Sequence, residues 1–297
     1  MVHRTTKDLT KLMSTVGVPV DFIKTGFTDL DNLIGGFVPG ELVIVAGRAK
    51  MGKTSVLLNL ARNISKTTPT MFLSLEMSAD LLLARLLSSI ALVPQERLHS
   101  TDLSQEEIVR IDLASRTMND LKLDIQDDSF LTPGKLKTYL KQFSEKYPGK
   151  FVVIIDYIQL MRSDNRITNR IYELQEILDL VCAELKLYPA ACIAAAQLNR
   201  QADQRDNKWP RLSDLRESGA IEMNADKVIF IHRADYYNLA EGDFTTSETG
   251  EAHIIVAANR RGRAGYVKLA FISDITSFVN VGKDDQIEIF DKDAIPF

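Results

Sequence analysis

The sequence predicts an α/β protein with a mostly parallel central sheet, flanked by helices, and with antiparallel strands at its C-terminal end. Short apolar, β-branched runs alternate with longer segments of helical period, which is typical of a parallel sheet covered by helices. The last three apolar runs follow one another without helices between them, so we expect antiparallel strands or a hairpin there. A glycine-rich motif lies between the first run and the first helix.

Seven apolar runs are the predicted strands, and five segments of helical period are the predicted helices. In chain order the strands are ELVIVA (41–46), PTMFLSL (69–75), FVVIID (151–156), ACIAAAQ (191–197), KVIFIH (227–232), HIIVAA (253–258) and VKLAFI (267–272). The helices are predicted at 54–66, 79–91, 104–119, 133–146 and 169–186. Polar segments rich in breakers at 162–169, 199–216 and 238–250 are predicted loops.

Length and composition favour one main domain. Residues 5–16 have weak helical periodicity and little to bury, so residues 1–20 are predicted to be an N-terminal arm or linker helix and residues 21–297 one domain.

The formal net charge is −4, so binding to a polyanion requires local basic patches. Two cysteines in apolar stretches suit a reducing compartment. Without an apolar run of roughly 18 residues or a signal-peptide core, we expect a cytoplasmic protein that contacts no membrane.

The glycine-rich motif is a complete phosphate loop. GRAKMGKT at 47–54 matches G-x-x-x-x-G-K-[ST] and stands between a predicted buried strand and a predicted helix. Its backbone N–H groups can surround phosphate oxygens, Lys53 can reach the outer phosphates, and the Thr54 hydroxyl can bind Mg²⁺. A simple glycine-rich turn is the alternative. The predicted ATP-binding residues are Gly47, Arg48, Ala49, Lys50, Met51, Gly52, Lys53, Thr54 and Ser55.

Three predicted strands end in residues that suit nucleotide hydrolysis. Asp156 ends FVVIID, at the edge where open α/β sheets place ligands, and suits the Mg²⁺ shell. Glu76 follows PTMFLSL, which we expect to neighbour the phosphate-loop strand, and is a candidate for polarising the attacking water. Gln197 ends ACIAAAQ and is a candidate for contacting the γ-phosphate or the attacking water. A turn-capping role for Asp156 and a helix-start role for Glu76 are the alternatives.

These motifs resemble the RecA-like motor domain of the DnaB family of replicative DNA helicases. The similarity runs from Thr25 to about Phe278 and includes SLEMS (74–78), IIDYIQLM (154–161), AQLNR (196–200) and the most specific string, SDLRESGAIEMNAD (213–226). The resemblance implies a ring, usually a hexamer, that binds ATP and Mg²⁺ between subunits and moves 5′ to 3′ along single-stranded DNA. It also implies that Lys53 contacts phosphate, that Thr54 and Asp156 serve Mg²⁺, that Glu76 is the catalytic glutamate and that Gln197 is the γ-phosphate sensor.

A basic hairpin is predicted near the C-terminal end. VAANRRGRAGYVK at 256–268 has four cations and no acid, which is costly for a hairpin tip unless anions visit it. A solvated basic turn is the alternative. The resemblance implies that Arg260 is an arginine finger for the nucleotide of a neighbouring subunit. The family usually has Lys where this chain has Ala258, so we expect altered rate or coupling unless Arg261 or Arg263 substitutes.

Two further loops are candidates for DNA binding. RSDNRITNR holds Arg162, Arg166 and Arg170, and the segment after Gln197 holds Arg200, Arg205, Lys208, Arg211 and Arg216. Such loops can grip phosphates in a central channel without base recognition. The resemblance implies that Arg216, Glu217 and Gly219 contact the DNA backbone, although Arg216 also suits a surface ion pair. Trp209, beside Pro210, is predicted to anchor its loop.

Three functions follow from this reading. The first is a ring helicase motor that unwinds duplex DNA in replication. The second is a helicase-like ATPase that regulates or loads a full-length helicase without unwinding. The third, a RecA-like recombinase or clock-type ATPase, is disfavoured by SDLRESGAIEMNAD. Only about 20 residues precede the motor, so we expect the family's N-terminal collar domain to be absent, which leaves contact with primase or a loader open.

Overall fold

The structure is a computed structural model that describes residues 20–199, 205, 207–215, 218–236, 250–282 and 288–289. The predicted arm, residues 1–20, lies outside the described residues except for Val20. The proposed division of the chain at residue 20 therefore stays a prediction.

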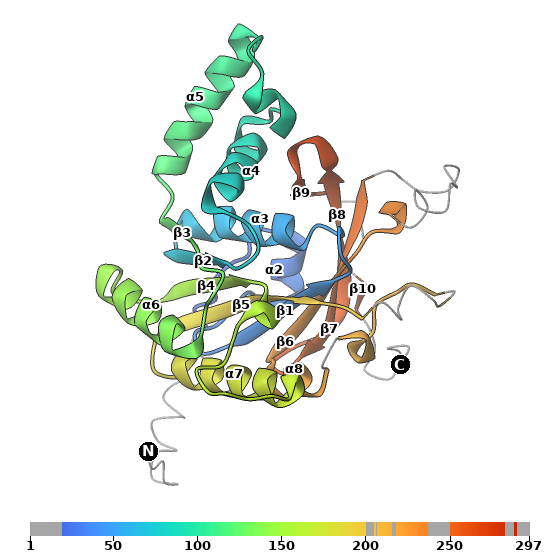
Figure 1. Cartoon of the computed structure of the whole chain (residues 1–297). Coiled ribbons are helices and arrows are strands. Elements are labelled where there is room, and N and C mark those ends of the chain that lie inside the picture. Colours follow the sequence, from blue (N-terminus) through green and yellow to red (C-terminus); the bar gives the residue numbers. More distant parts are fainter. Residues whose placement is uncertain are drawn as a thin grey trace.

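One sheet organises the described part of the chain (Figure 1). Its strand order is β10 (Glu288–Ile289), β8 (Gly265–Ile272), β7 (Glu251–Asn259), β6 (Lys227–His232), β1 (Leu42–Gly47), β5 (Ala190–Gln197), β4 (Phe151–Asp156), β2 (Thr70–Ser74) and β3 (Leu123–Asp127), with β9 (Ser277–Asn280) paired to β8. Strands β6, β1, β5, β4, β2 and β3 pair in parallel, and β7 to β10 pair antiparallel. The predicted fold class is confirmed.

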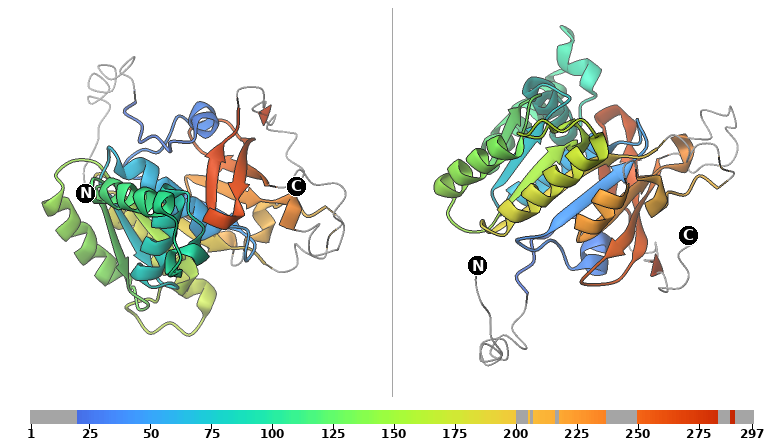
Figure 2. Two further views of the ribbon diagram at one scale, coloured as in Figure 1. Left: turned by 90° about the horizontal axis from the view of Figure 1, so that it is seen from above. Right: turned by 60° about the horizontal axis from the view of Figure 1, so that its bottom comes forward.

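Helices cover both faces of the sheet. α2 (Thr28–Ile34) and α3 (Lys53–Ser65) pack on one face, and α6 (Pro133–Lys146), α7 (Arg170–Leu185) and α8 (Ser218–Asn224) pack on the other (Figure 2). Side chains of β1 alternate between the two cores: Leu42 and Ile44 enter one, and Val43 and Val45 enter the other. Every residue of β1 is buried, as expected for a central parallel strand.

α4 (Ala79–Ala91) and α5 (Gln105–Asn119) extend beyond the sheet next to β2 and β3 (Figure 1). Ser78 caps α4 by accepting the Leu81 N–H, and Ser104 and Glu107 form a capping box at the start of α5. A small separate core joins the two helices through Ala91, Val93 and Ala114. Among the described helices, none combines the length and hydrophobicity needed to cross a lipid bilayer.

All seven predicted strands and all five predicted helices are present, with ends that differ by at most two residues. Among the described residues of the predicted domain, five further α-helices and strands are α2, β3, α8, β9 and β10. α2 and α8 have seven residues each, too few to establish a helical period. β3 is a half-buried edge strand and β9 has four residues, so neither forms a long apolar run.

Trp209 anchors the segment before α8 to the antiparallel strands. Its ring centroid lies 5.2 Å from that of His232, 5.2 Å from that of His253 and 5.5 Å from that of Tyr266. Arg205 donates to the Trp209 carbonyl at 3.2 Å and to the Asp214 carboxylate at 2.6 Å. The predicted anchoring role of Trp209 is confirmed, and Arg205 has an ion pair within the chain.

We predict that His232 makes the protein less stable in acid. Burial, with a smaller effect of His253, lowers the pKa of His232 from 6.5 to about 4. The unfolded chain binds this proton below about pH 6.5, whereas the folded chain binds it only near pH 4, so the contribution is full above pH 6.5 and is lost as the pH falls. Wild type should lose on the order of 3 kcal/mol of unfolding free energy through this group between pH 7 and pH 4.

Urea unfolding at several pH values measures this contribution. His232→Gln should have a shallower dependence on pH than wild type, while His99→Gln, at an exposed histidine, should keep the wild-type dependence. Equal slopes for wild type and His232→Gln would show that His232 contributes nothing to the acid sensitivity.

Candidate functional site

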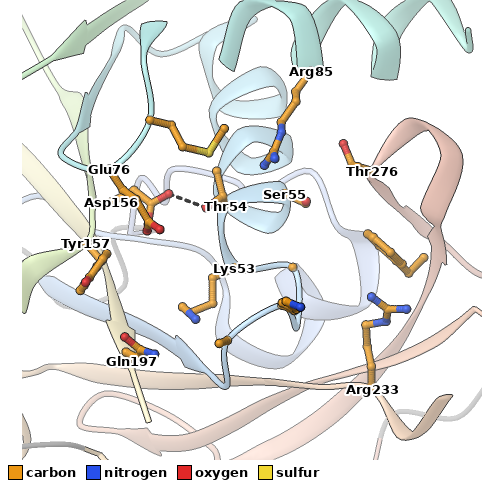
Figure 3. A pocket seen from close by; sticks show the side chains of 15 residues that line it. Lys53, Thr54, Ser55, Glu76, Arg85, Asp156, Tyr157, Gln197, Arg233 and Thr276 are labelled. Atoms are coloured by element: carbon orange, nitrogen blue, oxygen red, sulfur yellow. Dashed lines mark hydrogen bonds between the residues drawn. The ribbon is translucent and has the colours of Figure 1, made fainter. Parts of the chain in front are cut away.

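A pocket of about 520 Å³ opens where the parallel strands end (Figure 3). It is bordered by the phosphate loop, by the ends of β2, β4 and β5, by α4 and by the antiparallel strands. The side chains that line it belong to Ala49, Lys50, Gly52, Lys53, Thr54, Ser55, Glu76, Met77, Arg85, Asp156, Tyr157, Gln197, Arg233, Phe271 and Thr276.

The phosphate loop has the geometry that its glycines predict. Gly52 precedes α3 with a φ of 92°, and a Cβ at this position would lie 3.0 Å from the ring of Phe278. Glycine is therefore required both for the backbone conformation and for the space. α3 begins directly after it, so the first N–H groups of that helix face the pocket, an arrangement that favours anions.

Lys53 is folded back onto the loop that it belongs to. Its Nζ donates to the carbonyl oxygens of Gly47 and Arg48, both at 3.0 Å. Burial lowers the pKa of Lys53, while the carboxylates of Asp156 and Glu76 oppose this shift. A phosphate in the pocket would offer this buried ammonium group stronger acceptors than two carbonyls.

The nine predicted ATP-binding residues divide into two groups. Six of them line the pocket: Ala49, Lys50, Gly52, Lys53, Thr54 and Ser55. The other three shape the loop. Gly47 ends β1, Arg48 donates to the Leu198 carbonyl at 3.2 Å, and Met51 buries its side chain in the core.

Thr54 and Asp156 form a pair that suits a magnesium ion. The Thr54 hydroxyl donates to Asp156 Oδ2 at 2.6 Å, and Asp156 is buried. Burial raises the pKa of Asp156, although the Thr54 hydrogen bond and Lys53 act in the opposite direction. The described residues hold no group of three or more metal-ligating side chains. Two adjacent oxygen ligands are what Mg²⁺ uses when phosphates and waters complete its octahedron, so the donor set fits this ion.

Glu76 reaches the pocket from a strand that does not neighbour β1. Two strands, β5 and β4, separate β2 from β1, so the expected adjacency is wrong. Ser74 pairs with Asp156, and the Leu75 N–H donates to the Asp156 carbonyl at 2.8 Å, which keeps the chain beside β4. The Ser74 hydroxyl then donates to the Met77 carbonyl and accepts the Met77 N–H, which closes a turn that presents Glu76.

Gln197 ends β5 opposite Gly47, the first residue of the phosphate loop. Its side chain lines the pocket with those of Glu76 and Asp156 (Figure 3). The three strand-end residues predicted from the sequence are thus brought together in one pocket with Lys53 and Thr54.

Two cations of the pocket were not among the predicted site residues. Arg85 extends from α4 toward the pocket, and its Nε has no hydrogen-bond partner in the described part of the chain (Figure 3). Burial lowers the pKa of Arg85, against the attraction of Asp156 and Glu76. Arg233 forms an ion pair with Asp235 at 2.6 Å and stacks 4.0 Å from the Phe271 ring centroid. No spacing in the sequence relates these residues to the phosphate loop.

The sequence matches a known protein family over most of its length. The DnaB-like helicase C terminal domain family matches residues 22–280. The chain belongs to this family. Replicative DNA helicase DnaB of Buchnera aphidicola subsp. Baizongia pistaciae is 36% identical over 282 residues, which cover 93% of this chain and 59% of that protein. The DnaB of Leifsonia xyli subsp. xyli is 38% identical over 273 residues, which cover 90% and 57%. The chain therefore spans less than two thirds of these relatives.

Solved structures of DnaB-like proteins have the same fold. A DnaB-like replicative helicase, studied with its interactions with primase, has a TM-score of 0.86 and 28% sequence identity, and the similarity covers 95% of this chain and 68% of that one. The ATPase domain of G40P has a TM-score of 0.85 and 29% identity, and the similarity covers 93% of this chain and 97% of that one.

In this DnaB-like domain, Arg260 lies at the edge of the sheet opposite the phosphate loop. It follows Asn259, which pairs with Lys227, which in turn pairs with Val43 near the start of β1. Gly47 lies four residues farther along β1, roughly 13 Å away at the rise of a strand. The Arg260 side chain is 53% exposed and donates to the Met223 carbonyl at 2.5 Å.

Asp226 holds Arg260 at the start of β1. Its carbonyl accepts the Arg260 N–H at 2.9 Å, and its Oδ1 lies 3.9 Å from Arg260 Nη1. Its Oδ2 accepts the Leu42 N–H at 3.0 Å, and its own N–H donates to the Leu42 carbonyl at 2.8 Å. Arg261 lies 3.4 Å from the buried Glu41 carboxylate. The hairpin itself contains no acidic residue, but Asp226 and Glu41 from other segments lie beside its arginines.

The predicted DNA-binding residues differ in their surroundings. Arg162, Arg166 and Gly219 are exposed. Arg170 is half-buried and bonded within the chain. Three of the predicted residues lie outside the described residues: Arg200, Arg216 and Glu217.

We predict that Asp156→Asn stabilises the protein in the absence of nucleotide and metal. Because burial raises the pKa of Asp156, the charged form at pH 7 opposes folding, and the neutral amide can still accept the Thr54 hydrogen bond. The Tm should rise by roughly 2–4 °C for each kcal/mol gained. The gain should shrink as the pH falls through the raised pKa, because the wild-type carboxyl then becomes neutral.

Thermal unfolding in EDTA measures this difference, with Asp274→Asn, at an exposed aspartate, as the matched control. A lower Tm for Asp156→Asn at pH 7 would contradict the electrostatic argument.

Proposed function

We propose that this chain is the motor of a ring-shaped replicative helicase, which hydrolyses ATP to move along single-stranded DNA and unwind duplex DNA. One observation carries the proposal: the phosphate loop, Glu76, Asp156 and Gln197 share a pocket, while Arg260 lies at the opposite edge of the sheet. The relatives named replicative DNA helicase DnaB support it. We propose residues 21–297 as the ATPase domain and residues 1–20 as a linker to a neighbouring subunit.

The residues of the pocket have separate roles in hydrolysis. Lys53 moves from the carbonyls of its own loop to the β- and γ-phosphates, and the first N–H groups of α3 surround the phosphate oxygens. Glu76 orients and polarises the attacking water. Gln197 contacts the γ-phosphate, and Arg85 adds a half-buried positive charge. Thr54 and Asp156 would hold Mg²⁺, which neutralises charge on the phosphates when bound.

The separation of Arg260 from its own phosphate loop supports action in trans. An arginine side chain cannot span the roughly 13 Å between the two ends of β1 and still reach beyond the loop to a γ-phosphate. A neighbouring subunit that presents its exposed Arg260 edge to this pocket would supply the missing cation. Each nucleotide then needs two copies of the chain, which is what a closed ring, in this family a hexamer, provides.

Single-stranded DNA is the proposed track, with 5′ to 3′ polarity by family resemblance. With a formal net charge of −4, the chain must bind phosphates through local cations, and Arg162 and Arg166 are exposed in one loop. The DnaB-like helicase of similar structure interacts with primase, so primase or a helicase loader is the proposed further partner.

The direct test is ATP hydrolysis with and without single-stranded DNA, together with strand displacement by this chain alone. We expect DNA to raise kcat and the chain to displace a strand paired 3′ to a single-stranded 5′ tail. Hydrolysis that is indifferent to DNA would overturn the proposal. Strand displacement that occurs only when a full-length helicase is added would instead favour the regulator or loader function.

We predict that Arg260→Ala loses turnover but retains ATP binding. Loss of an arginine finger lowers kcat by roughly 10³-fold or more. In a mixture, Lys53→Ala chains keep the finger and Arg260→Ala chains keep the phosphate loop, so shared interfaces should regain turnover that neither variant has alone. Arg116→Ala, at an exposed arginine of α5, is the matched control and should behave as wild type.

Steady-state ATPase rates across mixing ratios provide the measurement. Full activity of Arg260→Ala alone would show that no finger is needed. A mixture as inactive as its components would show that Arg260 does not act across an interface.

A further inference from the structure

Gln197 ends β5 at the nucleotide pocket, next to the start of the predicted DNA loop at 199–216. Directly after it, Leu198 pairs with Leu215, and the Asn199 N–H donates to the Asp214 carbonyl at 2.7 Å. These contacts connect β5 to the segment that precedes residues 216–219. The ladder between β5 and β4 ends at the pair Ile155 and Ala194, three residues before Gln197.

The side chain of Gln159 continues that ladder. Its Oε1 accepts the Gln197 N–H at 3.3 Å, and its Nε2 donates to the Gln197 carbonyl at 3.4 Å. A side-chain amide has the same donor and acceptor as a peptide group, so Gln159 acts here as a replacement for a strand partner. The backbone of Gln197, and with it the direction of the sensor side chain, is fixed by this reciprocal pair.

Arg170 holds the segment that carries Gln159. Its Nη2 donates to the Gln159 carbonyl at 2.8 Å, and its Nη1 donates to the Met161 carbonyl at 3.3 Å. The same guanidinium forms an ion pair with Glu173. These contacts occupy Arg170 within the chain, in contrast to the exposed Arg162 and Arg166.

Glu173 and Glu176 connect this cluster to the exposed loop at 162–169. Glu173 accepts the Ser163 N–H at 3.1 Å. Glu176 accepts a hydrogen bond from the Ser163 hydroxyl and one from Asn165 Nδ2 at 2.6 Å. A continuous series of contacts therefore runs from the loop through Arg170 and Gln159 to Gln197.

We propose that Gln159 is a positioning residue that transmits the state of the 162–169 loop to Gln197. The inference rests on the proposed function, since it takes Gln197 as the γ-phosphate sensor and the loop as a DNA contact. Phosphates that bind Arg162 and Arg166 displace the loop, Arg170 carries the displacement to the Gln159 segment, and the Gln159 amide sets the orientation of Gln197. Hydrolysis then responds to DNA through this route.

Gln159→Leu tests the proposal, because leucine fills similar space without an amide. We expect the stimulation of kcat by single-stranded DNA to fall by about tenfold, within the range typical of coupling between linked sites. The KM for ATP and the affinity for a fluorescent ATP analogue should stay unchanged, because the phosphate loop is untouched. Gln159→Glu keeps the acceptor for the Gln197 N–H and should be intermediate. Gln175→Leu, which removes an amide bonded to Asp179 on α7, should behave as wild type.

A double-mutant cycle with Arg170→Ala separates transmission from general damage. If both residues act in one series, the double variant should lose no more stimulation than Gln159→Leu alone. Losses that multiply, or a Gln159→Leu variant with wild-type stimulation, would overturn the inference. Should Gln159→Leu fail to show a cooperative thermal transition, Gln159→Glu takes its place in the cycle. A wild type without DNA stimulation would overturn the proposed function instead.

Discussion

Parallel pairing of the central strands is the constraint on which the site depends. Parallel strands end at the same edge, so the register that places Gln197 opposite Gly47 and Ser74 opposite Asp156 gathers the phosphate loop, the two acids and Gln197. β7, in contrast, pairs antiparallel with β6. β7 runs back across the sheet, and Arg260 emerges at the far edge. A single change of strand direction thus separates Arg260 from the groups of the pocket.

The pocket brings several partly buried charged groups close together. Burial disfavours the charged forms of Lys53, Arg85 and Asp156, and their opposite charges only partly compensate. The Nε of Arg85 is buried and has no hydrogen-bond partner in the described part of the chain, so the cost of its burial is also only partly compensated. Such an arrangement costs stability, and a bound polyanion with its metal would offer these groups stronger partners. The side chains that suit ligand binding therefore lower the stability of the fold.

Most of the fold could be predicted because apolar period and length identify buried strands and long helices without tertiary information. The phosphate loop, Asp156 and Gln197 could be predicted because a motif or a strand end locates each of them. The contacts between strands and side chains that are distant in the sequence could not be predicted in this way. The order of strands, which sets β2 apart from β1, depends on crossovers that the sequence does not specify. The acids near Arg260 and Arg261 come from distant segments, and Arg170 is bonded to carbonyls that no side-chain pattern indicates.

The bonds of Asp226 have a mechanical consequence. Through Leu42 they join Arg260 to one end of β1, and β1 leads directly to the phosphate loop at the other end. The distance between the phosphate loop and Arg260 is therefore set by a short, fully buried strand. In the proposed ring, a rotation of one subunit would therefore move its phosphate loop and its Arg260 together.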